Sequence, residues 1–126
     1  MKPAYLLDSA ILIDHLRGIA SATEFIAALR EGEAVISAIT RAEVLAGGPD
    51  GEWAAAFSLC DQFQCLALNK ESADRAAELR RMHRWKLPDA FQAALAIEEG
   101  LRLVTRNSRD FDESAHPFVL VPYQVR

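Results

Sequence analysis

Residues 87–105 read Leu87-Pro88-Asp89-Ala90-Phe91-Gln92-Ala93-Ala94-Leu95-Ala96-Ile97-Glu98-Glu99-Gly100-Leu101-Arg102-Leu103-Val104-Thr105. The first part predicts an apolar helix, because Pro88 is placed where a helix begins and a missing N–H costs nothing. Gly100 is a typical helix end, and Leu101–Thr105 predicts a short buried strand. A helix that leads directly into a buried strand is the repeating unit of an α/β sheet.

The rest of the chain repeats this alternation of helical patterns and short apolar runs. The other expected strands are Ala4–Leu7, Ala34–Ser37, Cys65–Leu68 and Phe118–Pro122. Five other helices are expected. The first three are a short helix or turn over Ala10–Leu16, a helix capped by Ser21 or Thr23 that runs through Arg30, and a helix capped by Thr40 that carries Glu43. The last two are a helix over Glu52–Phe63 and a long helix, capped by Asn69, from Glu71 to about Trp85. The pattern predicts an α/β fold: a parallel sheet of about five short strands with helices on both faces, in a single domain over residues 1–126.

The composition is that of an ordinary globular protein, with 51% hydrophobic and 25% charged residues. No run approaches the roughly 18 uninterrupted apolar residues of a membrane span, so we expect no membrane association. Asp8 and Asp14 interrupt the apolar core that a secretory signal would need. These features predict a cytoplasmic protein.

The net charge of −4 argues against a protein that binds nucleic acid over its whole surface, which would usually be basic. Basic residues nevertheless gather just before Asp89, where Arg80, Arg81 and Arg84 are joined by Arg75 and Lys86. Such a group is often only the solvated face of a helix. It can also contact phosphate locally although the protein as a whole is acidic.

Cysteine and histidine form no pattern typical of a zinc or redox site. Cys60 and Cys65 lack the CxxC spacing, which favours two reduced thiols on or near the core. The histidines are scattered along the chain, at His15, His83 and His116. A metal in this protein would therefore be bound by oxygen, which favours Mg²⁺ or Mn²⁺.

Three carboxylates lie beside apolar segments at the expected ends of strands and helices: Asp8, Glu43 and Asp89. Taken singly, each has a structural explanation as a cap or as a favourable acid near a helix start. Together they lie where the carboxyl ends of parallel strands form a ligand crevice. An ionised carboxylate near apolar surroundings is costly, and a bound cation is the usual compensation. Their positions therefore predict a metal site.

Further oxygen ligands are available near this crevice. Ser9 can orient a water molecule or an acid beside Asp8, and the loop after the fourth strand offers Thr105, Asn107 and Asp110. Mg²⁺ ions held by such a group activate water and neutralise charge on a phosphodiester, with no histidine base required.

Four segments together resemble the motifs of PIN-domain nucleases. They are Asp8–Asp14, Thr40–Gly47, Leu87–Ala94 and Thr105–Phe111, and they come in the family's order over nearly the whole chain. The short length and the continuation Asp14-His15-Leu16-Arg17-Gly18 are most similar to the VapC toxins of bacterial type II toxin–antitoxin systems.

The resemblance implies a Mg²⁺-dependent endoribonuclease, with Mn²⁺ as a substitute, that is usually a homodimer and is inhibited by a small VapB-type antitoxin. Asp8, Glu43 and Asp89 would take the three acidic positions. Many PIN domains carry an acid two residues after the Thr, where this chain has Asn107. Either Asn107 or Asp110, one helical turn further on, remains as the fourth ligand.

Other classes of protein stay open as alternatives. The main one is a non-catalytic PIN-fold module that works through protein binding, although the intact acidic trio argues against it. A haloacid-dehalogenase-like phosphatase would need a second Asp where this chain has Ala10. A phosphotransfer receiver would need a lysine late in the chain, whereas the last one is Lys86.

Overall fold

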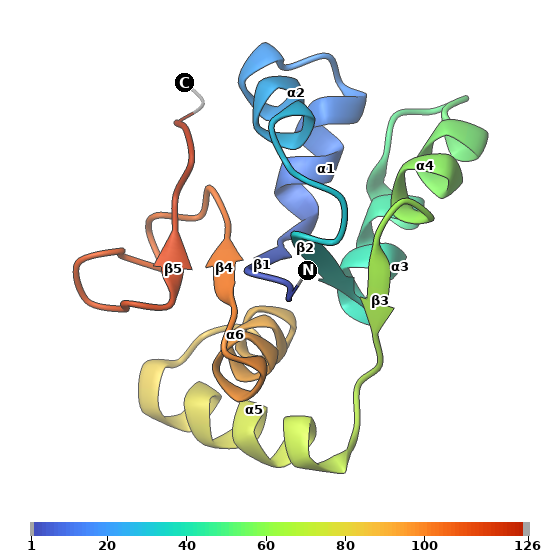
Figure 1. The fold of residues 1–126 in the computed structure, drawn as a ribbon. Helices are drawn as coiled ribbons and strands as arrows, with labels where there is room; N and C mark the ends of the chain where they lie inside the picture. The colour runs from blue at the N-terminus through green and yellow to red at the C-terminus, as the bar shows by residue number, and fades with distance from the viewer. Residues whose placement is uncertain (1, 125–126) are drawn as a thin grey trace.

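The computed structural model describes residues 2–124 and contains one five-stranded sheet (Figure 1). All neighbouring strands are parallel, in the order β3-β2-β1-β4-β5. The strands are β1 (Tyr5–Leu7), β2 (Ala34–Ser37), β3 (Gln64–Leu66), β4 (Arg102–Val104) and β5 (Val119–Leu120). The predicted parallel sheet of about five short strands is confirmed.

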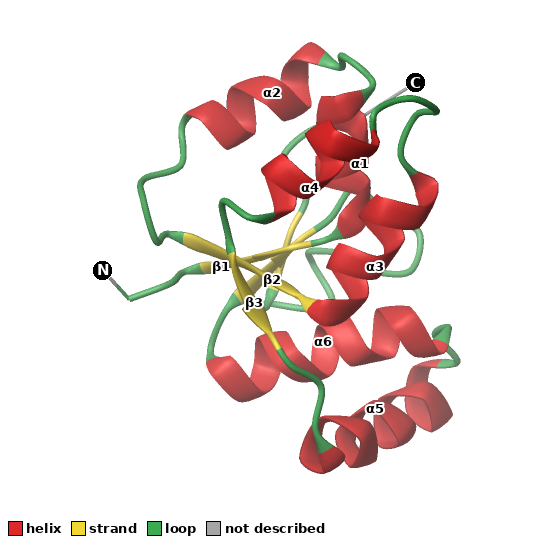
Figure 2. Ribbon diagram, turned by 90° about the vertical axis from the view of Figure 1, so that its right-hand side faces the viewer, coloured by secondary structure: helices red, strands yellow, loops and turns green. Residues whose placement is uncertain are grey.

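Six helices cover this sheet from both faces. They are α1 (Ser9–Leu16), α2 (Ala20–Ala27), α3 (Ala38–Gly47), α4 (Trp53–Cys60), α5 (Lys70–His83) and α6 (Leu87–Glu99). Figure 2 shows α1 to α4 on one face, with α5 and α6 on the other. The expectation of helices on both faces is confirmed.

Side chains along each strand point alternately to the two faces of the sheet, and the core therefore consists of two layers. Leu6 and Leu103 pack with the apolar residues of α6, whereas Leu7 and Val104 pack with those of α1, α3 and α4. Successive residues of a strand point to opposite faces. A strand that is covered on both faces is apolar on both, as Leu6–Leu7 of β1 and Leu103–Val104 of β4 are.

The order of the strands determines where a ligand site can form. The chain winds from β1 outward through β2 to β3, then returns to β4 on the other side of β1. Leu7 is paired with Val104 in the register of β1 and β4. Asp8 and Thr105, which directly follow this pair, therefore lie side by side at the carboxyl ends of β1 and β4. This is the point at which the order of the strands along the sheet reverses. This switch point is the usual ligand crevice of a doubly wound sheet.

Helix α3 begins earlier than predicted. The Ser37 hydroxyl accepts a hydrogen bond from the Thr40 N–H at 3.1 Å, so Ser37 is the N-cap and not Thr40. The Thr40 hydroxyl instead donates to the Leu7 carbonyl at 3.0 Å. As a result Glu43 lies in the second turn of α3, where a helix dipole contributes less than it does in the first turn.

Helix α5 is capped by Asn69 as predicted, with the Asn69 side chain accepting from the Ser72 N–H at 2.8 Å. It ends at His83, because Arg84 adopts a left-handed conformation with φ of 60°. The helical spacing of this segment predicts that its inward residues are Ala73, Ala76, Ala77, Leu79 and Met82. That prediction is wrong for Met82, which is 72% exposed. Ala73 and Ala77 are exposed as well, because α5 packs mainly on α6 and leaves its other sides in water.

Several other predicted boundaries were wrong. Helix α4 begins at Trp53 and ends at Cys60, whereas Glu52–Phe63 was predicted. Helix α2 begins at Ala20 and ends at Ala27 with no side-chain cap, so neither Ser21 nor Thr23 caps it; the Thr23 hydroxyl instead lies 2.8 Å from the His15 ring. The strands β3, β4 and β5 are shorter than the predicted ranges Cys65–Leu68, Leu101–Thr105 and Phe118–Pro122. Cys60 is buried as expected, whereas Cys65 on β3 is exposed.

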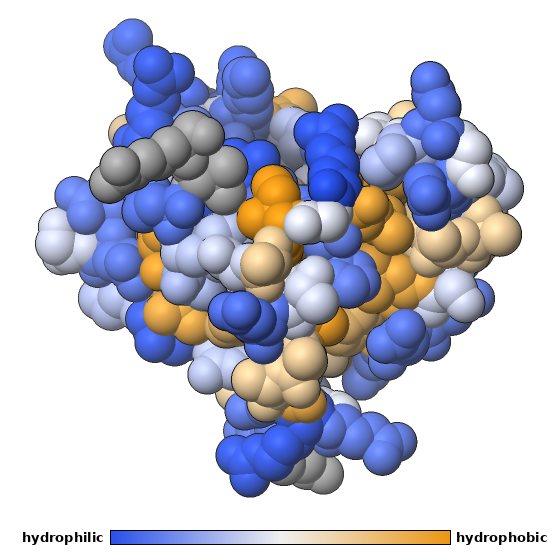
Figure 3. All heavy atoms as spheres, turned by 90° about the horizontal axis from the view of Figure 1, so that it is seen from above, coloured by the Kyte–Doolittle hydropathy of each residue, from blue (hydrophilic) through white to orange (hydrophobic). Residues whose placement is uncertain are grey.

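None of the helices in the described part of the chain is long and apolar enough to cross a membrane. Seen from above, polar side chains dominate the surface, and apolar ones gather near the centre and right of the view, over α1, α2 and α4 (Figure 3). Trp53, which begins α4, is 60% exposed. Its ring packs edge-on against Phe57 at 5.0 Å between centroids.

Candidate metal and active site

Asp8 lies at the switch point, between the end of β1 and the start of α1. Its backbone N–H donates to the Val104 carbonyl at 2.9 Å, and its carboxylate accepts from the Ser9 N–H and from the Thr105 hydroxyl, each at 2.8 Å. Burial raises the pKa of Asp8, while these hydrogen bonds and the nearby Arg106 charge oppose the rise. Asp8 caps the helix, as its structural explanation predicted, and it also places an acid in the crevice.

A buried polar network lies directly behind Asp8. Gln92, only 2% exposed, accepts from the Ser37 hydroxyl at 2.7 Å and donates to the Thr40 hydroxyl at 2.6 Å. Its amide also reaches an Asp8 oxygen at 3.5 Å. No buried side-chain polar atom within residues 2–124 lacks a partner, so the network is complete and ties β2, α3 and α6 to the strand end that carries Asp8.

Glu43 projects from α3 and is half-buried. Burial raises its pKa, a hydrogen bond from the Ser9 side chain lowers it, and the Asp8 carboxylate raises it again. The Ser9 backbone N–H donates to Asp8 at 2.8 Å, and the Ser9 side chain opposes the rise in the pKa of Glu43. The predicted supporting position of Ser9 is consistent with these contacts.

Asp89 comes from the opposite side of the crevice, in the first turn of α6. Its pKa is raised to about 6, first by burial and then by the charges of Asp8, Asp110 and Glu43, while Lys86 lowers it. A carboxylate whose pKa is raised by three others lies within their electrostatic reach. The acids predicted from three separate parts of the sequence are thus brought to one end of the sheet.

The three acids do not form a closed coordination shell. Within residues 2–124 no three histidine, cysteine or acidic side chains come close enough together to hold a metal ion between them. Mg²⁺ usually retains several waters and binds only one or two protein carboxylates directly. A donor set made only of oxygens, in which mutual repulsion already raises the pKa of Asp89, therefore suits a hard divalent cation.

The loop after β4 separates the two candidates for a fourth ligand. The Asn107 amide is engaged within the loop, since its nitrogen donates to the Asp110 carboxylate at 3.1 Å and its oxygen accepts from the Asp110 N–H at 3.3 Å. The Trp85 indole holds the loop by donating to the Asp110 carbonyl at 3.1 Å. Asp110 is the residue of this pair whose charge raises the pKa of Asp89. These contacts favour Asp110 as the acid that faces the site.

The arginines before Asp89 have unequal roles. Arg80 donates to the Trp85 carbonyl at 2.6 Å and so helps to close the turn between α5 and α6. Arg81 and Arg84 are exposed. A contact between RNA and Arg80, Arg81 or Arg84 stays a prediction.

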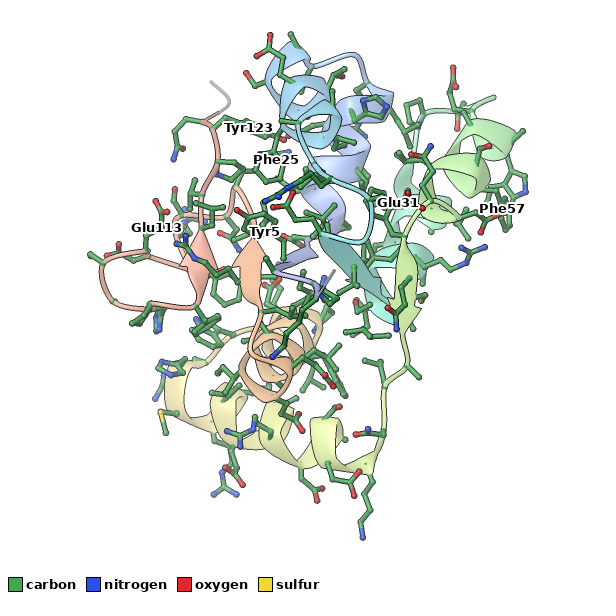
Figure 4. The ribbon with its side chains drawn as sticks, in the orientation of Figure 1. Tyr5, Phe25, Glu31, Phe57, Glu113 and Tyr123 are labelled. Carbon is green, nitrogen blue, oxygen red and sulfur yellow. The ribbon has the colours of Figure 1, made fainter. Side chains whose placement is uncertain are left out.

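A buried ion pair that the sequence pattern did not predict joins Asp14 to Arg106. The carboxylate of Asp14, 1% exposed in α1, accepts from Arg106 Nε at 2.6 Å and Nη2 at 3.2 Å. The Tyr123 hydroxyl donates to the same carboxylate at 2.9 Å. Figure 4 shows Tyr123 on the C-terminal segment, close to the helices α1 and α2. The sequence offered one signal, an acid that directly follows the apolar run Ala10–Ile13.

Comparison with known proteins places this site in a family. The family model described as "PIN domain" matches residues 5–117. The chain belongs to the PIN-domain family. It is 31% identical over 130 residues to "Ribonuclease VapC10" of Mycobacterium tuberculosis, covering 96% of this chain and 98% of that relative. The resemblance to VapC-type PIN domains is thereby confirmed, and the protein is a nuclease of that type.

Solved structures agree with this assignment. A toxin–antitoxin complex from Klebsiella pneumoniae is 32% identical to this chain, with a TM-score of 0.88, covering 97% of this chain and all of that one. FitAcB from Neisseria gonorrhoeae is 22% identical, with a TM-score of 0.78 and coverage of 96% and 99%, and supports the fold alone. Nucleases of the PIN-domain VapC type generally depend on a divalent metal.

Proposed function

We propose that this protein is a Mg²⁺-dependent endoribonuclease toxin that cleaves phosphodiester bonds in RNA. The observation that carries the proposal is the arrangement of Asp8, Glu43 and Asp89 around the switch point of the sheet, where the charges of the other two acids raise the pKa of Asp89. VapC10, the Mycobacterium relative, is itself described as a ribonuclease. The residues proposed to hold the cation are Asp8, Glu43 and Asp89, with Asp110 as an outer acid and Asn107 orienting Asp110.

When bound, Mg²⁺ or Mn²⁺ would neutralise charge on the phosphodiester and lower the pKa of a water molecule. The protein's part is to keep the donors in place. Thr105 and the N–H of Ser9 fix the orientation of the Asp8 carboxylate. Gln92 reaches the Asp8 carboxylate at 3.5 Å and donates to the Thr40 hydroxyl at 2.6 Å, which ties α6 and α3 to Asp8.

The partner of the toxin would be a VapB-type antitoxin that blocks this acidic site. Arginine is the side chain best suited to do so, because its planar guanidinium can bind a carboxylate through two parallel hydrogen bonds. We also propose that the chain is one PIN domain, acts in the cytoplasm and forms a homodimer. The exposed Trp53 and its contact with Phe57 on α4 favour that helix as part of the dimer interface.

The proposal is tested by expressing the chain without its antitoxin in a bacterium. The wild type is expected to arrest growth as intact RNA is lost, and the Asp8→Ala variant is expected to be harmless at the same protein level. Asp50→Ala is the matched control, because it removes an exposed acid from the turn before α4, and it should be as toxic as the wild type. Co-expression of a small antitoxin gene from the same operon should restore growth.

If the protein were instead a non-catalytic binding module, the wild type would be expected not to arrest growth. If the wild type and Asp8→Ala were equally harmless at matched levels, the nuclease activity would be absent and the binding module would be favoured. Equal toxicity of the two proteins would also contradict the proposed role of Asp8.

A further inference from the structure

An open hollow lies beside Asp8 on the surface of the protein. It has a volume of about 400 Å³ and is lined by Ala10, Arg106, Asn107, Ser108, Arg109 and Gln124. This volume is within the range of small-molecule sites, about 300–1,000 Å³. Two of the six lining residues are arginines and none is acidic, which contrasts with the adjacent group of carboxylates. The hollow therefore suits an anion.

One of these arginines is fixed before any ligand arrives. Arg106 Nε and Nη2 both bind the buried Asp14 carboxylate, which Tyr123 holds from another direction. The Arg106 side chain is still 37% exposed, although its partner is only 2% exposed. The guanidinium therefore keeps an outer edge with free N–H groups. This edge is already held in one orientation, so an anion that binds there does not have to order the side chain.

The other arginine supplies a charge that no acid neutralises. The ion pairs found among residues 2–124 involve Arg30, Arg41 and Arg106, and none involves Arg109. Arg109 is exposed on the loop after β4. Since Asp14 already balances Arg106, Arg109 provides the net positive charge of the hollow and Arg106 provides directed hydrogen bonds. Ser108 and Gln124 add neutral polar groups at its edge.

Residues that line the hollow are close in the sequence to residues of the acidic site. Arg106 follows Thr105, whose hydroxyl binds Asp8, and Ala10 is two residues beyond Asp8. The Arg106 charge also reaches Asp8, whose pKa it lowers. An anion in the hollow would therefore lie next to the group that the carboxylates act on, and not at a separate site.

We propose that Arg106 and Arg109 form a subsite that binds a phosphate of single-stranded RNA next to the phosphate that is cleaved. The subsite rests on the proposed ribonuclease function and adds the residues that position the strand. It gives the acidic protein a local place for the polyanion, on the β4 side of the site and apart from the arginines of α5. Single-stranded RNA is favoured because an unstacked backbone can lie across both the hollow and the acids.

The experiment measures cleavage of a short single-stranded oligoribonucleotide by the antitoxin-free protein. Arg109→Gln is expected to raise KM about tenfold with little change in kcat, as the loss of one charge-assisted contact would. The slope of log KM against log salt concentration should fall by about one unit. The matched control is Arg30→Gln, an exposed arginine before β2 at the other end of the sheet, and its KM should stay at the wild-type value.

A series of substrates, each with one phosphate replaced by an uncharged methylphosphonate, identifies the phosphate concerned. In the wild type one replacement near the cut should raise KM about as much as Arg109→Gln does, and in Arg109→Gln the same replacement should have no further effect. An unchanged KM in Arg109→Gln, or equal effects of every replacement in both proteins, would overturn the subsite while leaving the ribonuclease proposal intact. If the wild type cleaved no RNA, the proposed function would fail first, and the subsite with it.

Discussion

Asp8→Asn is expected to lower the rate of RNA cleavage on the order of 10² to 10³-fold without loss of the fold. Asparagine has the shape of aspartate and can still accept from the Ser9 N–H, but it lacks the charge that would attract a cation.

Asp8→Asn should also raise the melting temperature of the metal-free protein at pH 7. Burial raises the folded-state pKa of Asp8 above its ordinary value near 3.8, so the ionised side chain destabilises the fold at neutral pH.

The sign of this stability effect can be checked by varying the pH. The pKa of Asp8 is higher in the folded state than in the unfolded state, so the ionised carboxylate destabilises the fold at any pH above the folded-state pKa. This destabilisation disappears as the pH falls below 3.8, where the carboxyl is protonated in both states. The difference in melting temperature between Asp8→Asn and the wild type should therefore become smaller as the pH is lowered. Asp50→Asn, with the same chemical change in an exposed turn, should cleave RNA at the wild-type rate. Wild-type cleavage by Asp8→Asn would contradict the assignment.

Arg106→Ala is expected to lower the free energy of unfolding by roughly 2–3 kcal/mol. Removing one partner of a fully buried ion pair costs about 3–5 kcal/mol, and we expect less here because the Arg106 side chain is 37% exposed. The loss arises because Asp14, 2% exposed, would keep only the hydrogen bond from Tyr123. Urea unfolding at pH 7 measures this difference through the shift in midpoint.

Two further variants separate the buried carboxylate from other causes. Asp14→Asn combined with Arg106→Met should recover most of the lost stability, because the neutral amide can still accept from Tyr123 and no buried charge is left unpaired. Arg41→Ala breaks the surface pair with Asp61, which is 64% exposed, and should change the urea midpoint little. An Arg106→Ala protein with the wild-type midpoint would show that water already compensates Asp14.

The parts of the site that follow directly from strand order could be predicted from the sequence. In a parallel sheet the residues after each strand meet at one end, so Asp8 and Thr105 were placed together from their positions alone. Asp89 was predicted from Pro88 and the apolar helix after it, and the structure puts it in the first turn of α6. Local caps were less predictable, since both Ser37 and Thr40 can cap a helix and only the tertiary contact of Thr40 with Leu7 decides between them.

The partners of buried polar side chains could not be predicted, because they come from distant parts of the chain. Asp14 meets Arg106 and Tyr123, which lie 92 and 109 residues further along the sequence. The sequence does give a signal for Gln92, because it is a polar residue in the middle of an apolar helix. Its partners Ser37 and Thr40 nevertheless depend on the packing of α6 beneath β2 and α3.

The central claim is that Asp8, Glu43 and Asp89 together hold the cation needed for RNA cleavage. It is tested most directly by titrating the cleavage rate with Mg²⁺ at pH 7.5 and at pH 5.5. With a pKa of about 6, Asp89 is largely protonated at the lower pH in the absence of metal, so the cation must displace a proton. One such group raises the half-maximal Mg²⁺ concentration by 1 + 10^(6 − 5.5), or roughly fourfold. Undiminished cleavage in EDTA, or the same half-maximal concentration at both pH values, would contradict the claim.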